Sequence, residues 1–385
     1  MKKLLRLMSY ILVAALASAA TFCVTAFQPS DEYEKYLELK ALVGEKFIGD
    51  IDWKVAEDNA AAGLIAGLGD RWSYYIPASE YASYLEQVEN AYVGVGMTIQ
   101  LTEDGQGFLI IDVTEGGPAE AAGVQVDDIL VEIEGNSTVG MDVNQARDYV
   151  RGEEGTTVHL TFLRNGAKRE LDVERKRIET AVAEWQMLEG DVGYISLYEF
   201  SGDCSVAFEQ HFNKLMEQGA KALIMDLRDN PGGWVDDAVK VADLFLDKGE
   251  VASLRYRDGS EETYTTRDGK VDLPVVLLVN ENSASASEIL AGCLQDRERA
   301  TIVGTTTYGK GVVQWVLPIG DRGAGMQLTI AQYFTPNGNE VHKVGITPDV
   351  EAIMPEELVS EMYDIGDLND PQLKVAYDEA LKLAQ

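Results

Sequence analysis

Serines near position 285 have the type and spacing that nucleophilic catalysis requires. They lie in the stretch Asn280-Glu-Asn-Ser-Ala-Ser-Ala-Ser-Glu288, between the apolar run 274–279 and a helix predicted from about Ser285 to Gln295. The amino end of a helix presents unpaired backbone N–H groups, which stabilise a developing oxyanion. The stretch therefore predicts a nucleophile. As an alternative, Ser283, Ser285 and Ser287 are only helix caps, with Glu288 completing a capping box.

A lysine in the next loop is the candidate base. The sequence Gly304-Thr-Thr-Thr-Tyr-Gly-Lys-Gly311 nearly matches a phosphate-binding loop, but such a loop needs Ser or Thr after its lysine and then a helix. Here Gly311 follows, and VVQWV continues as a predicted strand. Lys310 instead fits a Ser-Lys dyad, if burial against Val312, Val313 and Trp315 lowers its pKa from about 10.4.

The three histidines are weak candidates for the base. His159 lies in a predicted strand, His211 in an amphipathic helix and His342 in a loop near the carboxyl end. The sequence contains neither a G-x-S-x-G elbow nor an H-E-x-x-H zinc motif. We therefore expect ordinary structural or surface roles for all three.

A glycine pair follows another apolar strand. In LIMDLRDNPGGWV, Gly232 and Gly233 come between a buried strand and a helix, where a backbone N–H can face a second strand end without side-chain obstruction. The alternative is that Asn-Pro-Gly-Gly is simply a turn.

The surrounding elements should bring these segments together. From Ile178 onward apolar strands alternate with helices, including one from about Val235 to Leu246, which predicts a largely parallel, buried sheet. The charged segment 255–270 carries two Asp-Gly turn signals and predicts a hairpin or lid. Residues 31–89 have helical spacing of apolar side chains, whereas 92–176 read as short strands with two helices. The acidic tail after Pro355 is helical in pattern and suggests no chemistry.

Composition limits the functions available to the chain. Its 385 residues include 65 acidic and 32 basic side chains, a formal net charge of -33, which argues against nucleic acid as a partner. Cys23, Cys204 and Cys293 form neither a disulfide framework nor a zinc-ligand pattern. No metal or organic cofactor is implied.

The amino terminus has the pattern of an export signal. Lys2, Lys3 and Arg6 precede an uncharged run from Leu7 to Gln28 that is long enough to span a bilayer. A retained membrane anchor is favoured, and a cleaved signal is the alternative because Ala17-Ser18-Ala19 offers a cleavage site. In either case the rest of the chain is expected outside the cytoplasm.

Taken together, the quoted blocks resemble the carboxyl-terminal processing proteases, also called tail-specific proteases. The resemblance lies in NENSASASEILAG, VGTTTYGKGVVQ, DLRDNPGGW and YFTPNGNEVHKVGITPDV, and it covers roughly Tyr33 to Val350. The segment GGPAEAAGVQVDDILVEIEG resembles the PDZ domain that these enzymes carry. The resemblance implies an α/β multidomain protein with a crotonase/ClpP-like ββα protease core, an inserted PDZ domain and N-terminal helices. The expected divisions are 1–28 signal or anchor, 31–90 helical region, 92–177 PDZ domain, 178–354 protease core and 355–385 helical tail.

The resemblance also implies roles for particular residues. Ser285, the middle serine of SASASE, would be the nucleophile, Lys310 the general base, and Gln314 would orient the lysine. The N–H groups of Gly233 and Ala286 would form the oxyanion hole.

In the PDZ-like segment, Gly94, Val95 and Gly96 would hold the carboxylate of a peptide terminus. A groove of this kind adds an extended peptide to a sheet edge, and the two glycines let successive amides point inward. The alternative is that these glycines only allow a tight bend.

The expected function is therefore an exported serine endopeptidase that cleaves protein substrates recognised by a free C-terminal carboxylate. A homo-oligomer is compatible with this function. The rival interpretations are a catalytically inactive PDZ-containing binding protein and a crotonase-like acyl-CoA enzyme. Two departures from the family pattern are GLGDRWSYY, where many members have a leucine-aspartate-proline turn, and Cys293, where a small alanine is usual. We expect them to affect the packing of the amino-terminal helices and to leave the chemistry unchanged.

Overall fold

The computed structural model describes residues 31–88, 91–102, 104–114, 116–179, 181–267, 269, 271–320, 323–358 and 363–384. The predicted signal or anchor at 1–28 lies outside these ranges. None of the helices within them is both long enough and apolar enough to cross a bilayer. The chain divides into two compact units, one ending at Gly67 and the other beginning at Leu68.

The first unit contains two helices, α2 (Asp31–Lys46) and α3 (Trp53–Ala66), which confirms the helical prediction for this stretch. The side chain of Asp52 caps α3 by accepting hydrogen bonds from two amides of its first turn. An ion pair between Lys40 and Glu57 links the two helices.

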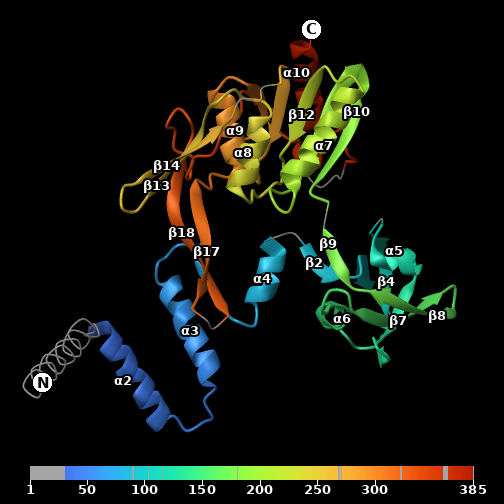
Figure 1. The fold of residues 1–385 in the computed structure, drawn as a ribbon, viewed down its shortest axis with the longest axis vertical. Coiled ribbons are helices and arrows are strands. Elements are labelled where there is room, and N and C mark those ends of the chain that lie inside the picture. The colour runs from blue at the N-terminus through green and yellow to red at the C-terminus, as the bar shows by residue number, and fades with distance from the viewer. Residues whose placement is uncertain are drawn as a thin grey trace, which may run out of the picture. The chain divides into compact units, whose positions relative to one another are not determined.

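The second unit contains a mostly parallel sheet, which Figure 1 shows with its helices. Its strands, in spatial order, are β10 (Ala183–Leu188), β11 (Val192–Leu197), β12 (Ala222–Asp226), β15 (Val275–Val279), β16 (Ala300–Gly304) and β19 (Val350–Glu351). Only β10 runs antiparallel to its neighbour. Every residue of β12 and β15 is buried, as the uninterrupted apolar runs predict for strands covered on both faces.

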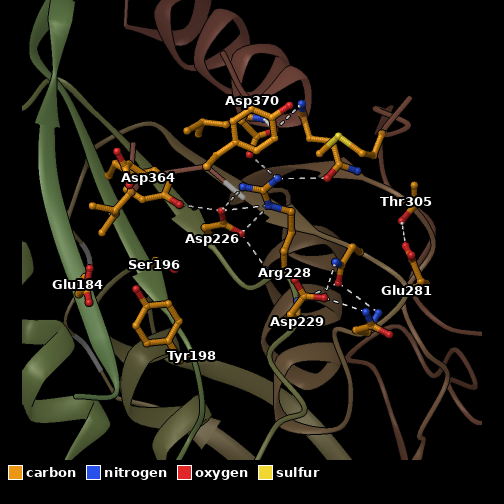
Figure 2. A pocket seen from close by; sticks show the side chains of 18 of the residues that line it. Glu184, Ser196, Tyr198, Asp226, Arg228, Asp229, Glu281, Thr305, Asp364 and Asp370 are labelled. Carbon is orange, nitrogen blue, oxygen red and sulfur yellow. Dashed lines mark hydrogen bonds and ion pairs between the residues drawn. The ribbon is translucent and has the colours of Figure 1, made fainter. Parts of the chain in front are cut away.

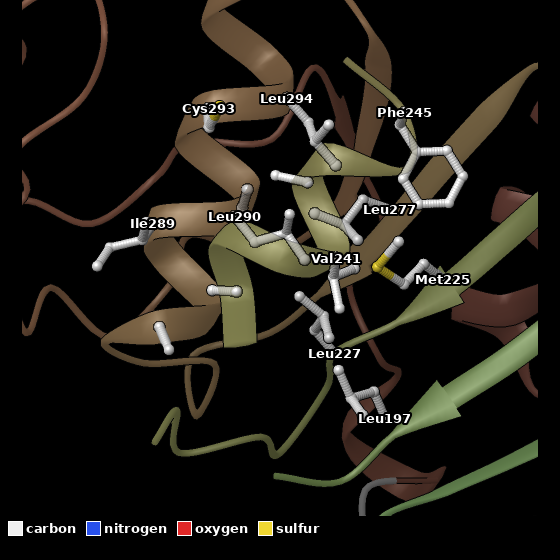
Figure 3. Packing of buried hydrophobic residues seen from close by; sticks show 14 of the residues in the cluster. Leu197, Met225, Leu227, Val241, Phe245, Leu277, Ile289, Leu290, Cys293 and Leu294 are labelled. Atoms are coloured by element: carbon white, nitrogen blue, oxygen red, sulfur yellow. The ribbon is translucent and has the colours of Figure 1, made fainter. Parts of the chain in front are cut away.

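Side chains alternate between two separate cores on the faces of this sheet. On one face, Met225 and Leu277 pack with the helices α7 (Cys204–Glu217), α8 (Val235–Asp243) and α9 (Ala286–Asp296), as Figure 3 shows for α8 and α9. On the other face, Ile224 and Leu278 pack with α10 (Pro371–Leu383). The predicted helical tail therefore contributes its own face to the core.

A second sheet contains β1 (Tyr74–Ile76), β13 (Gly249–Tyr256), β14 (Glu261–Thr266), β17 (Val312–Ile319) and β18 (Ala324–Phe334). The strands β13 and β14 form the predicted hairpin, with Asp258 and Gly259 in its turn. The prediction of helix throughout 31–89 is wrong at β1, because residues 74–76 pair with 325–327 of β18 and Ile76 is buried there. Pairing with a distant strand has overridden the local helical pattern.

A smaller sheet with its own hydrophobic core occupies the middle of the chain. Its strands are β3 (Met97–Leu101), β4 (Phe108–Val113), β5 (Ile129–Ile133), β6 (Asn136–Ser137), β7 (Thr157–Arg164) and β8 (Ala167–Glu174). The predicted short and longer helices are α5 (Pro118–Ala122) and α6 (Val143–Val150). A two-stranded ladder of β2 (Ala91–Gly94) and β9 (Lys176–Glu179) joins the ends of this segment. The remaining elements are the helix α4 (Tyr81–Val88) and two short 3-10 helices, Glu189–Asp191 and Glu356–Leu358.

Candidate active site

The three serines of the SASASE segment have different surroundings. Ser285 immediately precedes α9, is only partly buried and has φ 56°, ψ -113°. A non-glycine residue in this conformation is strained, and such strain is characteristic of functional turns. The hydroxyls of Ser283 and Ser287 are buried and donate to the carbonyls of Leu227 and Asn230. Of the three, only Ser285 has a side chain outside the buried interior. Ser285 and Glu288 also form the capping box of the alternative interpretation, so this segment both caps α9 and presents Ser285 at its start.

The predicted base follows the next parallel strand. Lys310 lies in the loop between β16 and β17, and the flanking glycines permit close backbone contacts: a Cβ at Gly311 would lie 2.2 Å from the backbone nitrogen of His342. The Nζ atom of Lys310 lies 4.4 Å from the ring centroid of Trp72. In the described part of the chain, Nζ makes no hydrogen bond, so the amine is not committed to a structural ion pair.

Glu288 connects the serine and lysine segments. Its side chain is fully buried, and its carboxylate accepts four hydrogen bonds. One oxygen accepts from the N–H groups of Ser285 (2.9 Å) and Lys310 (2.8 Å). The other accepts from the N–H of Gly309 and the hydroxyl of Thr307, both at 2.6 Å. Because both oxygens are saturated, the carboxylate fixes the two loops relative to each other.

The surroundings of Lys310 favour its neutral form. Burial lowers the pKa of the lysine below its ordinary value, because the ammonium loses hydration. The negative charge of Glu288 opposes this effect, whereas the positive charge of Arg71 lowers the pKa further. A partly deprotonated lysine is what a general base requires.

The glycine pair lies directly against the serine turn. A Cβ at Gly232, which has φ 99°, would lie 2.7 Å from Cβ of Ser285 and 2.8 Å from the nitrogen of Ala286. Asn230 holds this contact, since its carbonyl accepts from Ala284 N–H and its side-chain oxygen accepts from Gly232 N–H.

Two backbone N–H groups beside Ser285 are available for an oxyanion. Gly233 forms a parallel bridge with Phe200 through the hydrogen bonds of its neighbours, so its own N–H points away from that strand. Ala286 is the first residue of α9, where an N–H has no intrahelical acceptor. Neither group donates to any residue that the structure describes.

Gln314 and the histidines have other partners. Gln314 Nε2 donates to the hydroxyl of Thr329 at 3.2 Å, and the described residues include no hydrogen bond between Gln314 and Lys310. His159 pairs with Asp172, and His211 contacts the carbonyl of Ala183. The backbone of His342 packs on Gly311, but its ring makes no hydrogen bond to Ser285 in the described structure.

The sequence did not reveal the wall around the lysine. Arg71 and Trp72 belong to the GLGDRWSYY departure, which was expected to leave the chemistry unchanged, yet Trp72 contacts Lys310. The sequence indicates Glu288 only as a helix cap and Asn230 only as a turn residue. The position of Glu288, one helical turn after the candidate nucleophile, was a sequence signal for its role. No local sequence feature indicated that Trp72 lies beside Lys310.

The carboxyl ends of the parallel strands also border a cavity of about 830 Å³, shown in Figure 2. It contains neither Ser285 nor Lys310. In it, Arg228 forms ion pairs of 2.7 Å with both Asp226 of β12 and Asp370 at the start of α10. Tyr194 donates to the same carboxylate of Asp226 at 2.8 Å. These groups satisfy one another and attach α10 to the sheet, so we assign them a structural role. In the described ranges, no three His, Cys, Asp or Glu side chains form a group that could hold a metal ion.

The predicted carboxylate loop precedes an edge strand of the small sheet. Gly96 has φ 73°, and the carbonyls of Val95 and Gly96 accept from Ala119 and Thr114. Gly94, the third residue predicted for this loop, instead ends β2 and pairs with Lys176 of β9. The N–H groups of Val95 and Gly96 donate to none of the described residues. Beyond them, β3 pairs only with β4 in this sheet and faces α6. An edge strand, a neighbouring helix and free amides are the parts of a groove that captures peptide termini.

Comparison with known families defines the class of protein. The model of peptidase family S41 matches residues 191–352, which include the Ser285 and Lys310 loops, and a PDZ domain model matches residues 109–164. The fold is thus that of an S41 protease with a PDZ domain, which confirms the fold class expected from the sequence.

Individual relatives identify the family more closely. The chain is 32% identical over 370 residues to the carboxy-terminal processing protease CtpA of Bacillus subtilis strain 168, which covers 92% of this chain and 79% of the relative. It is 36% identical over 323 residues to the carboxy-terminal-processing protease of Bartonella bacilliformis, covering 82% and 73%. The solved structure of a photosystem II D1 C-terminal processing protease matches with a TM-score of 0.52 and 28% identity, covering 90% of this chain and 92% of that one. The chain belongs to the carboxy-terminal processing proteases, which are serine peptidases.

Proposed function

We propose that this chain is an exported endopeptidase that cleaves protein substrates chosen by their carboxyl-terminal tails, with Ser285 as nucleophile and Lys310 as general base. The observation that carries the proposal is the bridging of the Ser285 and Lys310 amides by one oxygen of Glu288. This bridge places an available hydroxyl and a weakly hydrated amine on two adjacent, fixed loops.

The reaction begins when Ser285 Oγ attacks the scissile carbonyl carbon and its proton passes to neutral Lys310 Nζ. Negative charge then develops on the carbonyl oxygen, and the N–H groups of Gly233 and Ala286 donate hydrogen bonds to it. As the C–N bond breaks, the Lys310 ammonium returns a proton to the leaving amine. Water then attacks the acyl-enzyme and gives a proton to Lys310. As the ester bond breaks, the Lys310 ammonium returns this proton to Ser285 Oγ, which regenerates the free serine and the neutral base.

Gln314 enters this scheme only indirectly. Its hydrogen bond to Thr329 joins β17 to β18, and the first residue of β17, Val312, follows the lysine loop. Orientation of Lys310 by Gln314 would require a hydrogen bond between them that is absent from the described residues. The PDZ-like groove would hold the substrate tail through the amides of Val95 and Gly96.

Export places this activity outside the cytoplasm, with residues 1–28 as a membrane anchor or a cleaved signal. No cofactor enters any step.

The test uses residues 31–385 and an unfolded protein with a free carboxyl terminus. We expect cleavage by the native chain and none by Ser285→Ala or Lys310→Arg, because guanidinium cannot accept the proton. Tail binding without cleavage by the native chain would support the inactive binding protein instead. Equal cleavage by Lys310→Arg would overturn the assignment of the base.

A further inference from the structure

The segment that precedes β1 places a second cation beside the candidate base. The guanidinium carbon of Arg71 lies 4.5 Å from the ring centroid of Trp72, and Lys310 Nζ lies 4.4 Å from the same centroid. Two cations that share one indole are separated by no more than the sum of these distances, which is close to the Debye length at physiological salt, about 8 Å. Their positive charges therefore interact.

The ring system around this pair is itself fixed. Trp72 packs edge-on against Tyr308 with centroids 6.0 Å apart, and Arg71 also lies over Tyr308, at 5.7 Å. Tyr308 N–H donates to the carbonyl of Ser283, so the contact extends to the serine segment. The Asp70 carboxylate accepts hydrogen bonds from the backbone N–H of Trp72 at 3.2 Å and from the Ser73 hydroxyl at 2.6 Å. The segment is thus held from both sides.

We propose that Arg71 and Trp72 are positioning residues for the dyad: the Trp72 ring seats the Lys310 amine, and the Arg71 guanidinium opposes the protonated form of that amine. The proposal rests on the proposed function, because it assumes that Lys310 is the base. Arg71 cannot itself transfer protons, since guanidinium stays charged.

The two residues act in opposite directions on the lysine. An aromatic face attracts an ammonium, which taken alone would hold Lys310 in its charged form. Arg71 offsets this attraction by repulsion, and it lowers the pKa of Lys310 while Glu288 raises it. The ring therefore fixes the position of Nζ, and the guanidinium favours its neutral state.

Three other segments place ionisable residues near Lys310 and Ser285. Asp70 belongs to the same turn as Arg71, Tyr333 of β18 donates to the Ser285 carbonyl, and the His342 backbone packs on Gly311. Among the charged groups, Glu288 and Arg71 act on Lys310 itself. Arg71 is exposed and Glu288 is fully buried, so only the contribution of Arg71 should respond to salt.

The test measures the rate at which a fluorophosphonate phosphonylates Ser285, with loss of fluoride, across a range of pH. This probe needs the base but no peptide substrate or PDZ groove. We expect Arg71→Gln to move the midpoint of the profile to higher pH, with the same plateau. Below the native midpoint, the variant should react about three- to tenfold more slowly, because a larger fraction of Lys310 is then protonated.

Arg71→Lys should restore the native midpoint, and about 1 M salt should narrow the difference between Arg71→Gln and the native chain. Trp72→Leu should lower the rate at every pH, whereas Trp72→Phe should retain most of it. Arg255→Gln is the matched control, because Arg255 is also exposed and lies 4.5 Å from an aromatic centroid, that of Phe334. It should leave the profile unchanged.

Two outcomes would overturn the inference: an Arg71→Gln profile with an unmoved midpoint, or an equal shift in Arg255→Gln. A Lys310→Arg chain that still reacts would instead remove the proposed function, so the two failures are distinguishable.

Discussion

One carboxylate oxygen of Glu288 accepts hydrogen bonds from the backbone amides of both Ser285 and Lys310. The candidate nucleophile and base therefore share a single buried anchor, although a helix and a strand separate them in the chain. The anchor acts on the backbone, so it sets the positions of both residues and leaves their reactive atoms free.

Replacement of Glu288 should test this anchor. Glu288→Gln should lower activity on the order of 100-fold. The amide nitrogen of glutamine cannot accept the two hydrogen bonds that one carboxylate oxygen accepts, so the serine and lysine loops should shift. The free energy of unfolding should fall on the order of 3 kcal/mol, measured by urea denaturation. Glu281→Gln is the control, since exposed Glu281 accepts, among the described residues, only from the Thr305 hydroxyl. Native activity in Glu288→Gln would refute the anchor.

The three serines should separate into one functional and two structural residues. Ser285→Ala should abolish cleavage and change stability by less than about 1 kcal/mol. Ser283→Ala and Ser287→Ala should each lose about 1 to 2 kcal/mol of stability, because each removes a buried hydrogen bond to the carbonyl of Leu227 or Asn230, while cleavage persists. Cleavage rates and thermal unfolding of the three variants decide the assignment, which moves if Ser283→Ala or Ser287→Ala is the inactive one.

The lowered pKa of Lys310 predicts that both activity and one component of the stability increase with pH. Activity of the native chain should rise with pH through the folded-state pKa, since only neutral lysine accepts a proton. The free energy of unfolding should contain a component that increases as pH rises from the folded-state pKa toward the unfolded value of about 10.4. In this pH range the lysine is protonated in the unfolded chain and neutral in the folded chain, so a rise in pH favours the folded state. Lys310→Met should be inactive, should lack this component and should be at least as stable as the native chain at neutral pH. A marked loss of stability in Lys310→Met would contradict the burial of an unfavourable ammonium.

The contact between Gly232 and the serine turn should tolerate no side chain. In Gly232→Ala the new Cβ would lie 2.6 Å from the Ala284 carbonyl oxygen, so the turn must move. We expect cleavage to fall on the order of 100-fold and stability to fall by at least about 2 kcal/mol. Gly219→Ala is the control: Gly219 also has positive φ, 90°, but open space at its Cβ, so its cost should be about 1 kcal/mol of backbone strain with normal cleavage. Equal effects in both variants would show that strain, and not contact with Ser285, is responsible.

Tail recognition should depend on the terminal carboxylate. The Ser285→Ala chain should bind a free-acid peptide with an apolar end more tightly than its amide, by about 1.5 to 3 kcal/mol, the value of a charge-assisted hydrogen bond. Calorimetric titration with the matched peptides measures this difference. Equal affinities would mean that the amides of Val95 and Gly96 do not read the carboxylate.

Much of this organisation follows from local sequence. Uninterrupted apolar runs become the buried strands β12 and β15, and the Asp-Gly signal gives the β13–β14 hairpin, because burial on both faces and turn conformation are encoded by neighbouring residues. The candidates Ser285 and Lys310 are recognisable for the same reason, since each follows such a strand.

Other features depend on segments that are distant in the chain. The residues of β1 have a helical pattern but form a strand, since β18 supplies an edge that local propensity cannot anticipate. The surroundings of Lys310 were decided in the same way, because its nearest ring comes from Trp72 and its backbone anchor from Glu288. The sequence by itself determined which side chains are able to react. Only the tertiary structure decided what surrounds them, because desolvation, repulsion and hydrogen bonding depend on distances in space and not on separation along the chain.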